Sequence, residues 1–504
     1  MAKMTRRNFL ATGVAATAGA VTPRGVSAPA GGRADGNPPN VLLIMSDQHT
    51  RNALGASGNS VVRTPNLDAL ARSAVRLDNA YCTYPVCVCS RASLLSGLYT
   101  HNHRAYNNST PWPFEVKTLG HYFGRVGYMT GMIGKMHFVD AQTHGFDYKL
   151  DFNDWHQYLG PKSQRVAEEI VDPNSGSGLP QIDDLWRDSG DPWTGLIPQD
   201  GRQGYTSIGR ISALAEEDHF ENFVARESIR FLRNHGKKQP FFLISSFLKP
   251  HDPVTPPERF AKMFHAPDMK LPDTWGMVKM DTIPASVQRQ VKYCWWAPEL
   301  RYPEMGKVHM ALYYSCLAHM DDNVGKLLRA LTDLGLDENT IVLYTSDHGE
   351  MLGEHGLWGK MFFYEGSVGV PLIFRVPGIT PPNAQCLAPV SLVQLAPTLL
   401  ELCGLNIPVG LDGTSMARLL HQPNAPAEGT VFAEMSLKTH QPAFMIRQNN
   451  LKYSYYMDDL DELYDLRSDP AEMKNLSQLL EFREKRDELK RQLFAWQKPE
   501  AQIA

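Results

Sequence analysis

Two acidic residues close two short apolar runs that lie far apart in the chain. The runs N-V-L-L-I-M-S-D and T-I-V-L-Y-T-S-D end in Asp47 and Asp347, which are followed by Gln48 and His348. Runs of this kind favour parallel strands covered on both faces, and ligands gather at the carboxyl ends of such strands. The two acids can therefore face one site, where carboxylate and amide oxygens suit a hard divalent cation.

Residues 87–97, C-V-C-S-R-A-S-L-L-S-G, place two cysteines beside a serine and an arginine. Taken alone, a C-x-C pair is more often a disulfide, a metal clip or a pair of buried thiols. An aspartate after a strand is likewise often a helix cap or a turn residue. Neither pattern indicates catalysis in isolation, so the interpretation depends on the motifs taken together.

Residues 87–97 resemble the signature of the type I sulfatases, which belong to the alkaline phosphatase-like superfamily. In that signature a cysteine is followed two positions later by Pro or Ala and then by Ser-Arg, and it is oxidised to formylglycine. Cys87 is the expected precursor, because only from Cys87 do Ser90 and Arg91 fall in register. Cys89 stands where the family has Pro or Ala, so the efficiency of conversion is a question for experiment.

The metal-binding motifs of the family recur in the same order. Asp47, Gln48, Asp347 and His348 resemble its divalent-metal ligands, which meet beside position 87. The resemblance implies one divalent metal, Ca²⁺ first, with Mg²⁺ and Mn²⁺ as alternatives. Many sulfatases have Asn at the imidazole position, whereas His occurs in the phosphonate and choline sulfate branches.

Cationic motifs accompany these ligands. The elements G-K-M-H-F, K-P-H-D-P and G-K-M-F also match the family. Several fixed cations suit a sulfate ester, because its oxygens are anionic and charge shifts to the leaving oxygen. The resemblance implies a catalytic set of Cys87, Arg91, Lys135, His137, Lys249, His251 and Lys360. Within it, Arg91 holds the hydrated formylglycine, His251 protonates the leaving alcohol and His137 is the base that lets sulfate depart.

The activity implied is hydrolysis of a sulfate ester by S–O cleavage, with release of inorganic sulfate. Its substrate is a small-molecule or carbohydrate sulfate ester, and a formylglycine-generating maturation enzyme is an implied partner. Two alternatives remain open. A phosphonate monoester or phosphodiester hydrolase uses the same machinery, and an unmodified homologue would be a non-catalytic binding protein. Residues 134–138 and 360–365 also resemble choline sulfatases.

Strand and helix patterns alternate along most of the chain. The periodicity predicts strands over 40–47, 128–133, 240–247 and 340–347, and helices over 64–76, 118–126, 220–233, 308–334 and 390–403. This alternation predicts an α/β sandwich with a mainly parallel central sheet, as the resemblance also implies. The helix that contains 313–328 is expected to be a packing helix, in which His319, Asp321 and Asp322 are not ligands.

The pattern changes after about residue 425. Short strand-like runs at 431–436, 443–447 and 451–456 and a closing helix near 479–496 predict a small antiparallel sheet. We therefore expect a sulfatase-like catalytic domain over 40–424 and a smaller α+β domain over 425–504. Irregular stretches at 173–204 and 265–303 are expected to be surface excursions of the kind that rim a substrate cleft.

The N-terminus resembles a twin-arginine export signal. Residues 1–28 combine T-R-R-N-F-L, a mildly apolar run and V-S-A, a motif of the cleavage-site type. A linker is expected over 29–39. The apolar run is too short for a spanning helix, so no permanent membrane anchor is expected. The implied partner is the twin-arginine translocase, and the implied location is periplasmic or extracellular.

The composition argues against a nucleic-acid partner and against a disulfide framework. The chain is 43% hydrophobic and has 50 basic against 54 acidic residues, a formal net charge of −4. A mildly acidic chain without a basic stripe argues against nucleic acid as a partner. Seven cysteines at irregular spacing do not form a disulfide framework. The sequence does not indicate an oligomeric state.

Overall fold

The computed structural model describes residues 38–139, 142–163, 209–212, 214–294 and 297–497. The signal expected over 1–28, most of the linker expected over 29–39 and the excursion expected at 173–204 lie outside these residues. In the part of the chain that is described, no helix combines the length and the apolar character needed to cross a membrane.

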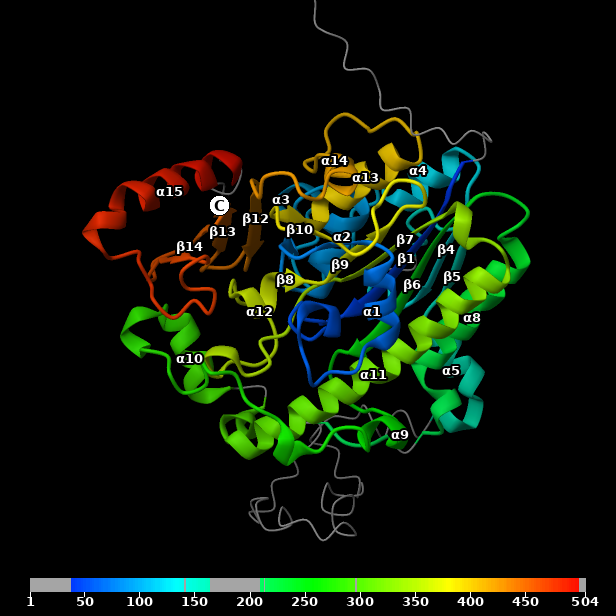
Figure 1. Cartoon of the computed structure of the whole chain (residues 1–504). Coiled ribbons are helices and arrows are strands. Elements are labelled where there is room, and N and C mark those ends of the chain that lie inside the picture. The colour runs from blue at the N-terminus through cyan, green and yellow to red at the C-terminus, as the bar shows by residue number, and fades with distance from the viewer. Residues whose placement is uncertain (1–37, 140–141, 164–208, 213, 295–296, 498–504) are drawn as a thin grey trace, which may run out of the picture.

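A large sheet occupies the centre of the molecule (Figure 1). Its strands are β1 (Asn40–Asp47), β2 (Val75–Leu77), β4 (Met129–Gly134), β5 (Tyr148–Leu150), β6 (Phe241–Pro250), β7 (Thr340–Ser346), β9 (Leu372–Arg375) and β10 (Ala384–Cys386). They follow the order β10-β2-β9-β7-β1-β6-β4-β5, in which only β9 runs antiparallel to its neighbours. The mainly parallel sheet expected from the sequence is confirmed.

Helices cover both faces of this sheet, because the strands are apolar on both sides. Leu42 and Ile44 of β1 pack with one layer, α1 (Pro65–Arg72), α5 (Phe152–Leu159), α8 (Phe220–His235) and α11 (Pro303–Asp333). Leu43 and Met45 face the opposite layer, α2 (Cys87–Ser96), α4 (Leu119–Arg125) and α13 (Leu395–Leu402). The other α-helices of the described residues are α3 (Thr100–His103), α9 (Glu258–Ala261), α10 (Ala285–Tyr293), α12 (Glu365–Val368), α14 (Ala417–His421) and α15 (Arg483–Gln497).

The two strands that end in aspartate are direct neighbours. β1 pairs in parallel with β7 in unbroken register from Asn40 opposite Thr340 to Ser46 opposite Ser346. On its other side β1 pairs with β6, the strand that leads to His251. Three strand ends therefore deliver their following residues to one edge of the sheet.

Most expected helices are present, and one expectation was partly wrong. The patterns at 64–76, 118–126, 220–233 and 308–334 correspond to α1, α4, α8 and α11. The pattern at 390–403 begins instead with the strand β11 (Val390–Ser391), which pairs with β3 (Ala80–Tyr81) in a three-stranded sheet completed by β8 (Gly369–Val370). Tertiary pairing overrides helical periodicity there, and the helix α13 starts only at Leu395.

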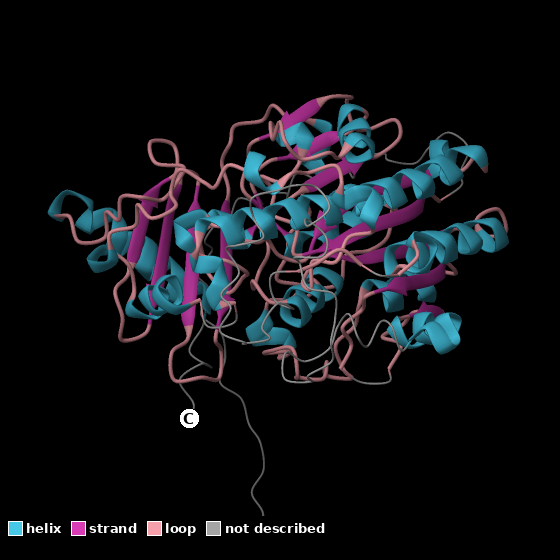
Figure 2. Ribbon diagram, turned by 90° about the horizontal axis from the view of Figure 1, so that it is seen from below, coloured by secondary structure: helices cyan, strands magenta, loops and turns pink. Residues whose placement is uncertain are grey.

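The C-terminal part forms the antiparallel sheet that the sequence predicts (Figure 2). Its order is β12 (Thr430–Met435), β13 (Ala443–Gln448), β14 (Leu451–Tyr456) and β15 (Glu462–Asp465), and α15 packs against it. β15 was not expected from the sequence. Val431, Met445 and Tyr453 join the same apolar cluster as Val41 of β1, so the two sheets share a core. The domain boundary at 424/425 stays a prediction.

Candidate active site

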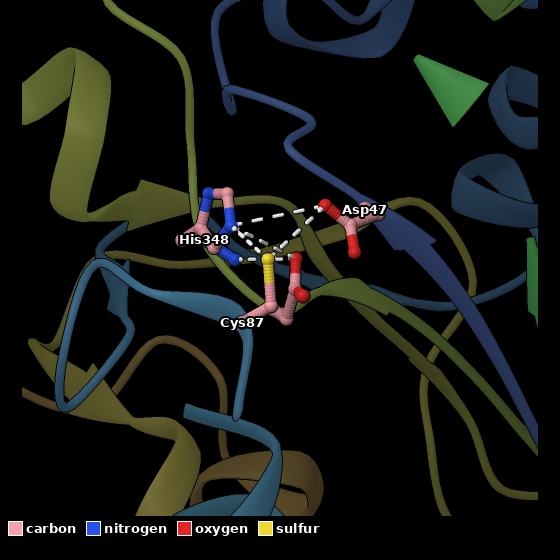
Figure 3. Close-up of side chains that lie close together, drawn as sticks. Asp47, Cys87 and His348 are labelled. Carbon is pink, nitrogen blue, oxygen red and sulfur yellow. Dashed lines mark hydrogen bonds and ion pairs between the residues drawn. The ribbon is translucent and has the colours of Figure 1, made fainter. Parts of the chain in front are cut away.

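Four potential metal ligands meet at the carboxyl ends of the central strands (Figure 3). Asp47 ends β1, Asp347 and His348 follow β7, and Cys87 begins α2. One ligand atom from each lies within 4.8 Å of the others, and all four side chains are buried. The structure thus brings together residues that the sequence separates widely, and these four define the Cys87 cluster.

The Cys87 thiol is surrounded by cationic and imidazole groups. Its Sγ lies 3.2 Å from His348 Nε2, 3.4 Å from Lys360 Nζ and 3.8 Å from Lys135 Nζ. Burial raises the pKa of Cys87, but Lys135, Lys360 and His348 outweigh burial and hold that pKa well below its usual value. The position at the first turn of a helix favours the thiolate as well.

Arg91 ties the two aspartates together from the next turn of α2. Its Nη2 donates to Asp47 Oδ2 and its Nε to Asp347 Oδ2, both at 2.8 Å. Its Nη1 donates to the Lys135 carbonyl at 2.7 Å and to the Ser246 hydroxyl at 2.9 Å. Arg91 is fully buried, so these bonds fix the position of both carboxylates.

Asp47 carries the strongest concentration of cations. Lys135 Nζ lies 2.6 Å from its Oδ2, and His251 Nε2 lies 3.7 Å from its Oδ1. Burial and the Cys87 thiol raise the pKa of Asp47. The neighbouring Lys135, His251 and Arg91 lower it by more, so the pKa of Asp47 lies below its usual range. Asp47 is therefore ionised at neutral pH and can act as a ligand or an ion-pair partner.

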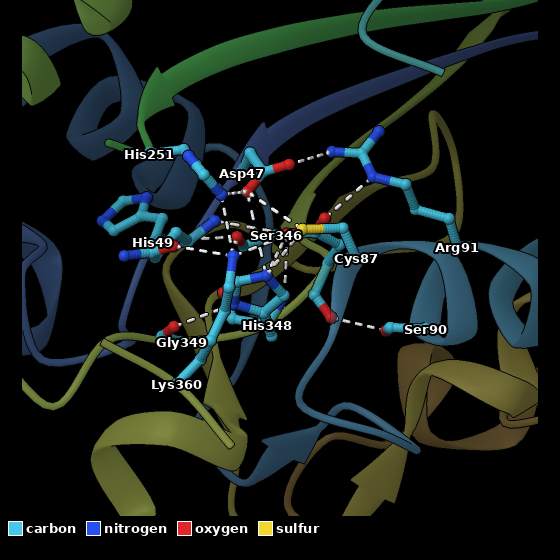
Figure 4. Close-up of polar contacts among 12 residues, drawn as sticks. Asp47, His49, Cys87, Ser90, Arg91, His251, Ser346, His348, Gly349 and Lys360 are labelled. Atoms are coloured by element: carbon cyan, nitrogen blue, oxygen red, sulfur yellow. Dashed lines mark hydrogen bonds and ion pairs between the residues drawn. The ribbon is translucent and has the colours of Figure 1, made fainter. Parts of the chain in front are cut away.

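Lys360 and His251 form a hydrogen-bonded pair beside the thiol (Figure 4). His251 Nδ1 faces the Asp252 carbonyl at 2.6 Å and donates to it. Its Nε2 is then free to accept, and Lys360 Nζ lies 2.7 Å away. Lys360 also donates to Gln48 Oε1 at 3.0 Å, which joins the basic pair to the end of β1.

Gln48 is held by two acids, one of which the sequence interpretation missed. Its Nε2 donates to Asp252 Oδ2 at 3.0 Å and to Glu350 Oε2 at 2.5 Å. Glu350 is buried, and burial together with Asp252 raises its pKa. Its place shortly after Asp347, in S-D-H-G-E, was the available signal. The Gln48 backbone adopts a positive φ of 63°, and the Tyr313 hydroxyl donates to its carbonyl at 2.7 Å.

Two predicted catalytic residues differ in where the structure places them. A hydrogen bond from His137 contributes to the lowered pKa of Cys87, so His137 lies beside the thiol, and its buried Nδ1 has no hydrogen-bond partner. The Lys249 ammonium instead donates to the Pro253 carbonyl and, at 3.1 Å, to the Thr255 hydroxyl. The charge of Lys249 is thus engaged away from the Cys87 cluster.

Cys89 occupies a different environment from Cys87. Its side chain is fully buried in the apolar cluster beneath α2. Burial, the neighbouring Cys87 and Glu434 raise the pKa of Cys89 well above its usual value. A protonated, enclosed thiol is a poor nucleophile, which agrees with the assignment of the reactive position to Cys87.

A cavity of about 560 Å³ adjoins the cluster, and Gln48, His251 and Lys360 line it. Other lining residues come from α10, the segment around Trp358 and the connection between β12 and β13. They include Ser286, Val287, Gln290, Trp358, Thr439 and Gln441. Three residues of the stretch 265–303, Ser286, Val287 and Gln290, therefore line the cavity, and they belong to the helix α10 where an irregular stretch was expected.

The donor set fits a divalent cation. Two buried carboxylates supply hard oxygen ligands, and His348 donates from Nδ1 to the Gly349 carbonyl at 2.9 Å, which leaves Nε2 directed at the cluster. Arg91 and Lys135 balance part of the negative charge. A site with an imidazole among oxygen ligands does not by itself select one ion.

Comparison with known proteins places this arrangement in a family. The sulfatase family matches residues 39–405, and the family described as N-sulphoglucosamine sulphohydrolase, C-terminal, matches residues 353–499. An arylsulfatase of Clostridium perfringens is 30% identical over 465 residues, which cover 90% of this chain and 93% of the relative. A choline-sulfatase of Rhizobium meliloti is 30% identical over 451 residues, which cover 87% and 82%.

Among solved structures, the phosphonate monoester hydrolase of Agrobacterium radiobacter superposes with a TM-score of 0.72 at 25% identity. The match covers 91% of this chain and 95% of that one. Fold, ligand set and sequence likeness agree over nearly the whole described chain. The chain therefore belongs to the sulfatase family, within the alkaline phosphatase-like superfamily, and is a sulfuric ester hydrolase.

Proposed function

We propose that this enzyme cleaves the S–O bond of a sulfate ester with a formylglycine made from Cys87 and releases inorganic sulfate. The reaction uses one bound divalent metal ion, for which Ca²⁺ is our first choice. The observation that carries the proposal is the position of Cys87, whose Sγ contacts His348, Lys135 and Lys360. Of these contacts, Lys360 also lines the cavity. The metal ligands we propose are Asp47, Gln48, Asp347, His348 and the modified residue 87.

The nucleophile is a hydroxyl of the hydrated aldehyde at position 87. A bound divalent cation would lower the pKa of that hydroxyl and offset the charges of the two aspartates. Arg91, which is anchored on both aspartates, orients the residue one helical turn before it. Lys135 and Lys360 neutralise the sulfuryl oxygens, because their ammonium groups already flank the position of attack.

Proton transfer completes the reaction. As the hydroxyl attacks sulfur, its proton leaves to solvent and the bond to the ester oxygen breaks. His251, which is hydrogen-bonded to the Lys360 ammonium, passes a proton to the departing alcohol and is reprotonated from solvent, so that Lys360 keeps its charge. His137, whose Nδ1 has no other partner, then takes the proton of the second hydroxyl. The C–O bond to sulfate breaks, the aldehyde is restored, and water hydrates it for the next turnover.

The test combines peptide analysis with kinetics. The protein is co-expressed with a formylglycine-generating enzyme, and the peptide that carries position 87 is analysed by mass spectrometry. We expect the aldehyde at position 87, a thiol at Cys89, and turnover of an aryl sulfate that Cys87→Ala abolishes. Cys89→Ala is the matched control and should keep turnover. Active protein that carries only a thiol at position 87 would contradict the proposal.

A second candidate is phosphonate monoester or phosphodiester hydrolysis with the same nucleophile. It is supported by the imidazole of His348 in the ligand set and by the structural likeness to a phosphonate monoester hydrolase. The ratio of kcat/KM for an aryl sulfate, a phosphodiester and a phosphonate monoester distinguishes the two. A large preference for the phosphorus esters would replace the sulfate assignment.

The maturation enzyme and the twin-arginine translocase stay predicted partners, and a periplasmic or extracellular location stays a prediction. The first partner rests on the signature at 87–97. The translocase and the location rest on residues 1–28, which lie outside the described residues. The translocase and the location are tested together by fractionating cells that express the full chain and cells that express a variant in which Arg6 and Arg7 are both changed to Lys.

A further inference from the structure

A second cluster of potential ligands lies outside the active site, between α8 and α11. His219 precedes α8, Glu221 is in its first turn, and His319 is in the middle of α11. One ligand atom from each lies within 4.8 Å of the others. All three side chains are buried, with exposed fractions of 4%, 1% and 0%. Figure 1 shows the two helices side by side on the same face of the sheet.

Within the part of the chain that the structure describes, each imidazole has one ring nitrogen that is paired and one that has no hydrogen-bond partner. His319 Nε2 lies 2.6 Å from Asn222 Oδ1, which also accepts from Asn323 Nδ2, so Nε2 is the protonated nitrogen. The buried Nδ1 of His319 is left with an unshared lone pair and no hydrogen bond. A buried polar atom in this state costs about 1–3 kcal/mol unless something satisfies it.

His219 also has one paired and one unpaired ring nitrogen, but here the unpaired nitrogen is Nε2. Its ring bonds to the backbone of Leu214, and its Nε2 is buried without a partner. Metal-binding histidines characteristically donate their second N–H to a carbonyl or amide oxygen, which fixes the tautomer and aims the other nitrogen at the ion. In both His219 and His319, one ring nitrogen makes such a bond and the other is left available to an ion.

The charges around the cluster are compatible with a cation. Burial lowers the pKa of His219 to about 4 and holds that of His319 well below its usual value, so both rings are neutral ligands. Burial raises the pKa of Glu221, and a bound cation would favour its carboxylate form, whose Oε1 accepts from the Lys249 backbone N–H at 3.1 Å. The Lys249 ammonium, which bonds to the Pro253 carbonyl and the Thr255 hydroxyl, opposes a cation, and the Glu221 carboxylate offsets it.

We propose that His219, Glu221 and His319 bind a first-row transition metal ion, with Zn²⁺ as the ion that best matches two imidazoles and one carboxylate. Two imidazoles and one carboxylate are a recognised three-ligand zinc set, in which a water completes the four-coordinate site, with ligand distances of about 2.0–2.2 Å. The proposal departs from the expectation stated from the sequence, in which His319 belongs to a packing helix and is not a ligand. The fold is what brings His219 and Glu221 to His319.

The ion is a structural clip. Since the three ligands are buried, it enters while the chain folds and links the start of α8 to the centre of α11. Glu221 also holds the backbone of Lys249 at the end of β6, two residues before His251. The clip therefore fixes the strand end that delivers His251 to the Cys87 cluster.

The experiment measures metal content and position in the full chain, produced without a histidine tag and with Zn²⁺ in the medium. Wild-type protein should contain one zinc ion that His219→Gln and His319→Gln each remove and that Asp347→Asn, at the other cluster, retains. His309→Gln, a change at another buried histidine of α11, is the matched control and should retain it. Asn222→Ala should weaken zinc binding by about 10–100-fold, the usual effect of removing a partner that orients a ligand.

Anomalous scattering at the zinc edge from wild-type crystals locates the ion without any variant, so the test stands even if a variant fails to fold. A peak between His219 Nε2 and His319 Nδ1 is the expected result. Absence of that peak, or zinc content that Asp347→Asn removes and His319→Gln does not, would overturn the proposal.

Discussion

Arg91 donates to Asp47 at 2.8 Å, and neither side chain is exposed to solvent. A buried ion pair of this kind gains little over apolar packing, but breaking it strands a charge in the interior. Here one guanidinium also serves Asp347, so its loss would leave two carboxylates without their shared partner. The pair is therefore a sensitive point for both stability and metal affinity.

Replacement of Arg91 by Met should lower the free energy of unfolding by about 3–5 kcal/mol, the usual cost of an uncompensated buried charge. Urea denaturation of the calcium-saturated protein measures it. Arg259→Met is the control, because Arg259 pairs with Glu216 at the surface, where an ion pair contributes about 0–1 kcal/mol. Equal losses in the two variants would show that the buried network has no special role.

The two cysteines of the signature should ionise at opposite ends of the pH scale. In protein made without the maturation enzyme, the pKa of Cys87 lies well below 9.0 and that of Cys89 well above it. As pH falls below 9.0, the thiolate ultraviolet absorbance of Cys87 should therefore persist and disappear only at much lower pH. The difference spectrum between wild type and Cys87→Ser measures it, and Cys89→Ser should leave the signal unchanged.

Lys360 and Lys249 should contribute differently to kcat. Lys360→Met removes the cation that contacts Cys87 and His251, and we expect kcat for an aryl sulfate to fall by about 10²–10³, as when one stabilising donor is lost. Lys249→Met removes an ammonium that bonds to Pro253 and Thr255, so most of kcat should remain. A larger loss of kcat for Lys249→Met would restore the catalytic role expected from the sequence.

Chelation of the active-site metal should destabilise the enzyme as well as inactivate it. Without a cation, Arg91 and Lys135 are the charged groups that lie nearest to the carboxylates of Asp47 and Asp347, at 2.6–2.8 Å. Calorimetry should show a melting temperature that falls with a chelator and rises again with added Ca²⁺ in a concentration-dependent way. Asp347→Asn should need more Ca²⁺ for the same rise, and the same dependence in both proteins would argue against Asp347 as a ligand.

Substrate affinity should depend on the helix α10. Gln290 lines the cavity, whereas its neighbour Arg289 is exposed. Gln290→Ala should raise KM with little change in kcat, because it removes a contact made equally in the ground and transition states. Arg289→Ala is the matched control and should alter neither constant. A fall in kcat without a change in KM would place Gln290 in the reaction itself.

The sequence predicted the parts of the site that reside in local motifs. The strands that lead to Asp47 and Asp347 follow from their apolar runs, and Cys87 follows from the family signature at 87–97. What it could not predict depends on side-chain direction. Lys249 sits in a matching motif, but its stem turns toward Pro253, and no local pattern encodes that choice.

Residues that act through distant partners were missed for the same reason. Glu350 matters because it meets Gln48 across the sheet edge, and His319 matters because α8 delivers His219 and Glu221 to it. Val390 and Ser391 have helical periodicity but become a strand, since β3 offers them a pairing edge. In each case the deciding contact comes from a segment remote in the chain.

The direct pairing of β1 with β7 also sets a minimum time between the synthesis of Cys87 and its enclosure in the fold. Asp347 must be made before it can close over Cys87, and Cys87 is fully enclosed in the finished fold. At about 5–20 residues per second, translation from Cys87 to Asp347 takes roughly 10–50 s. For that time the cysteine is present but cannot yet be enclosed by its final neighbours. A strand order built from sequence neighbours would close that interval earlier, so the long-range pairing leaves an interval in which the proposed maturation enzyme can reach Cys87.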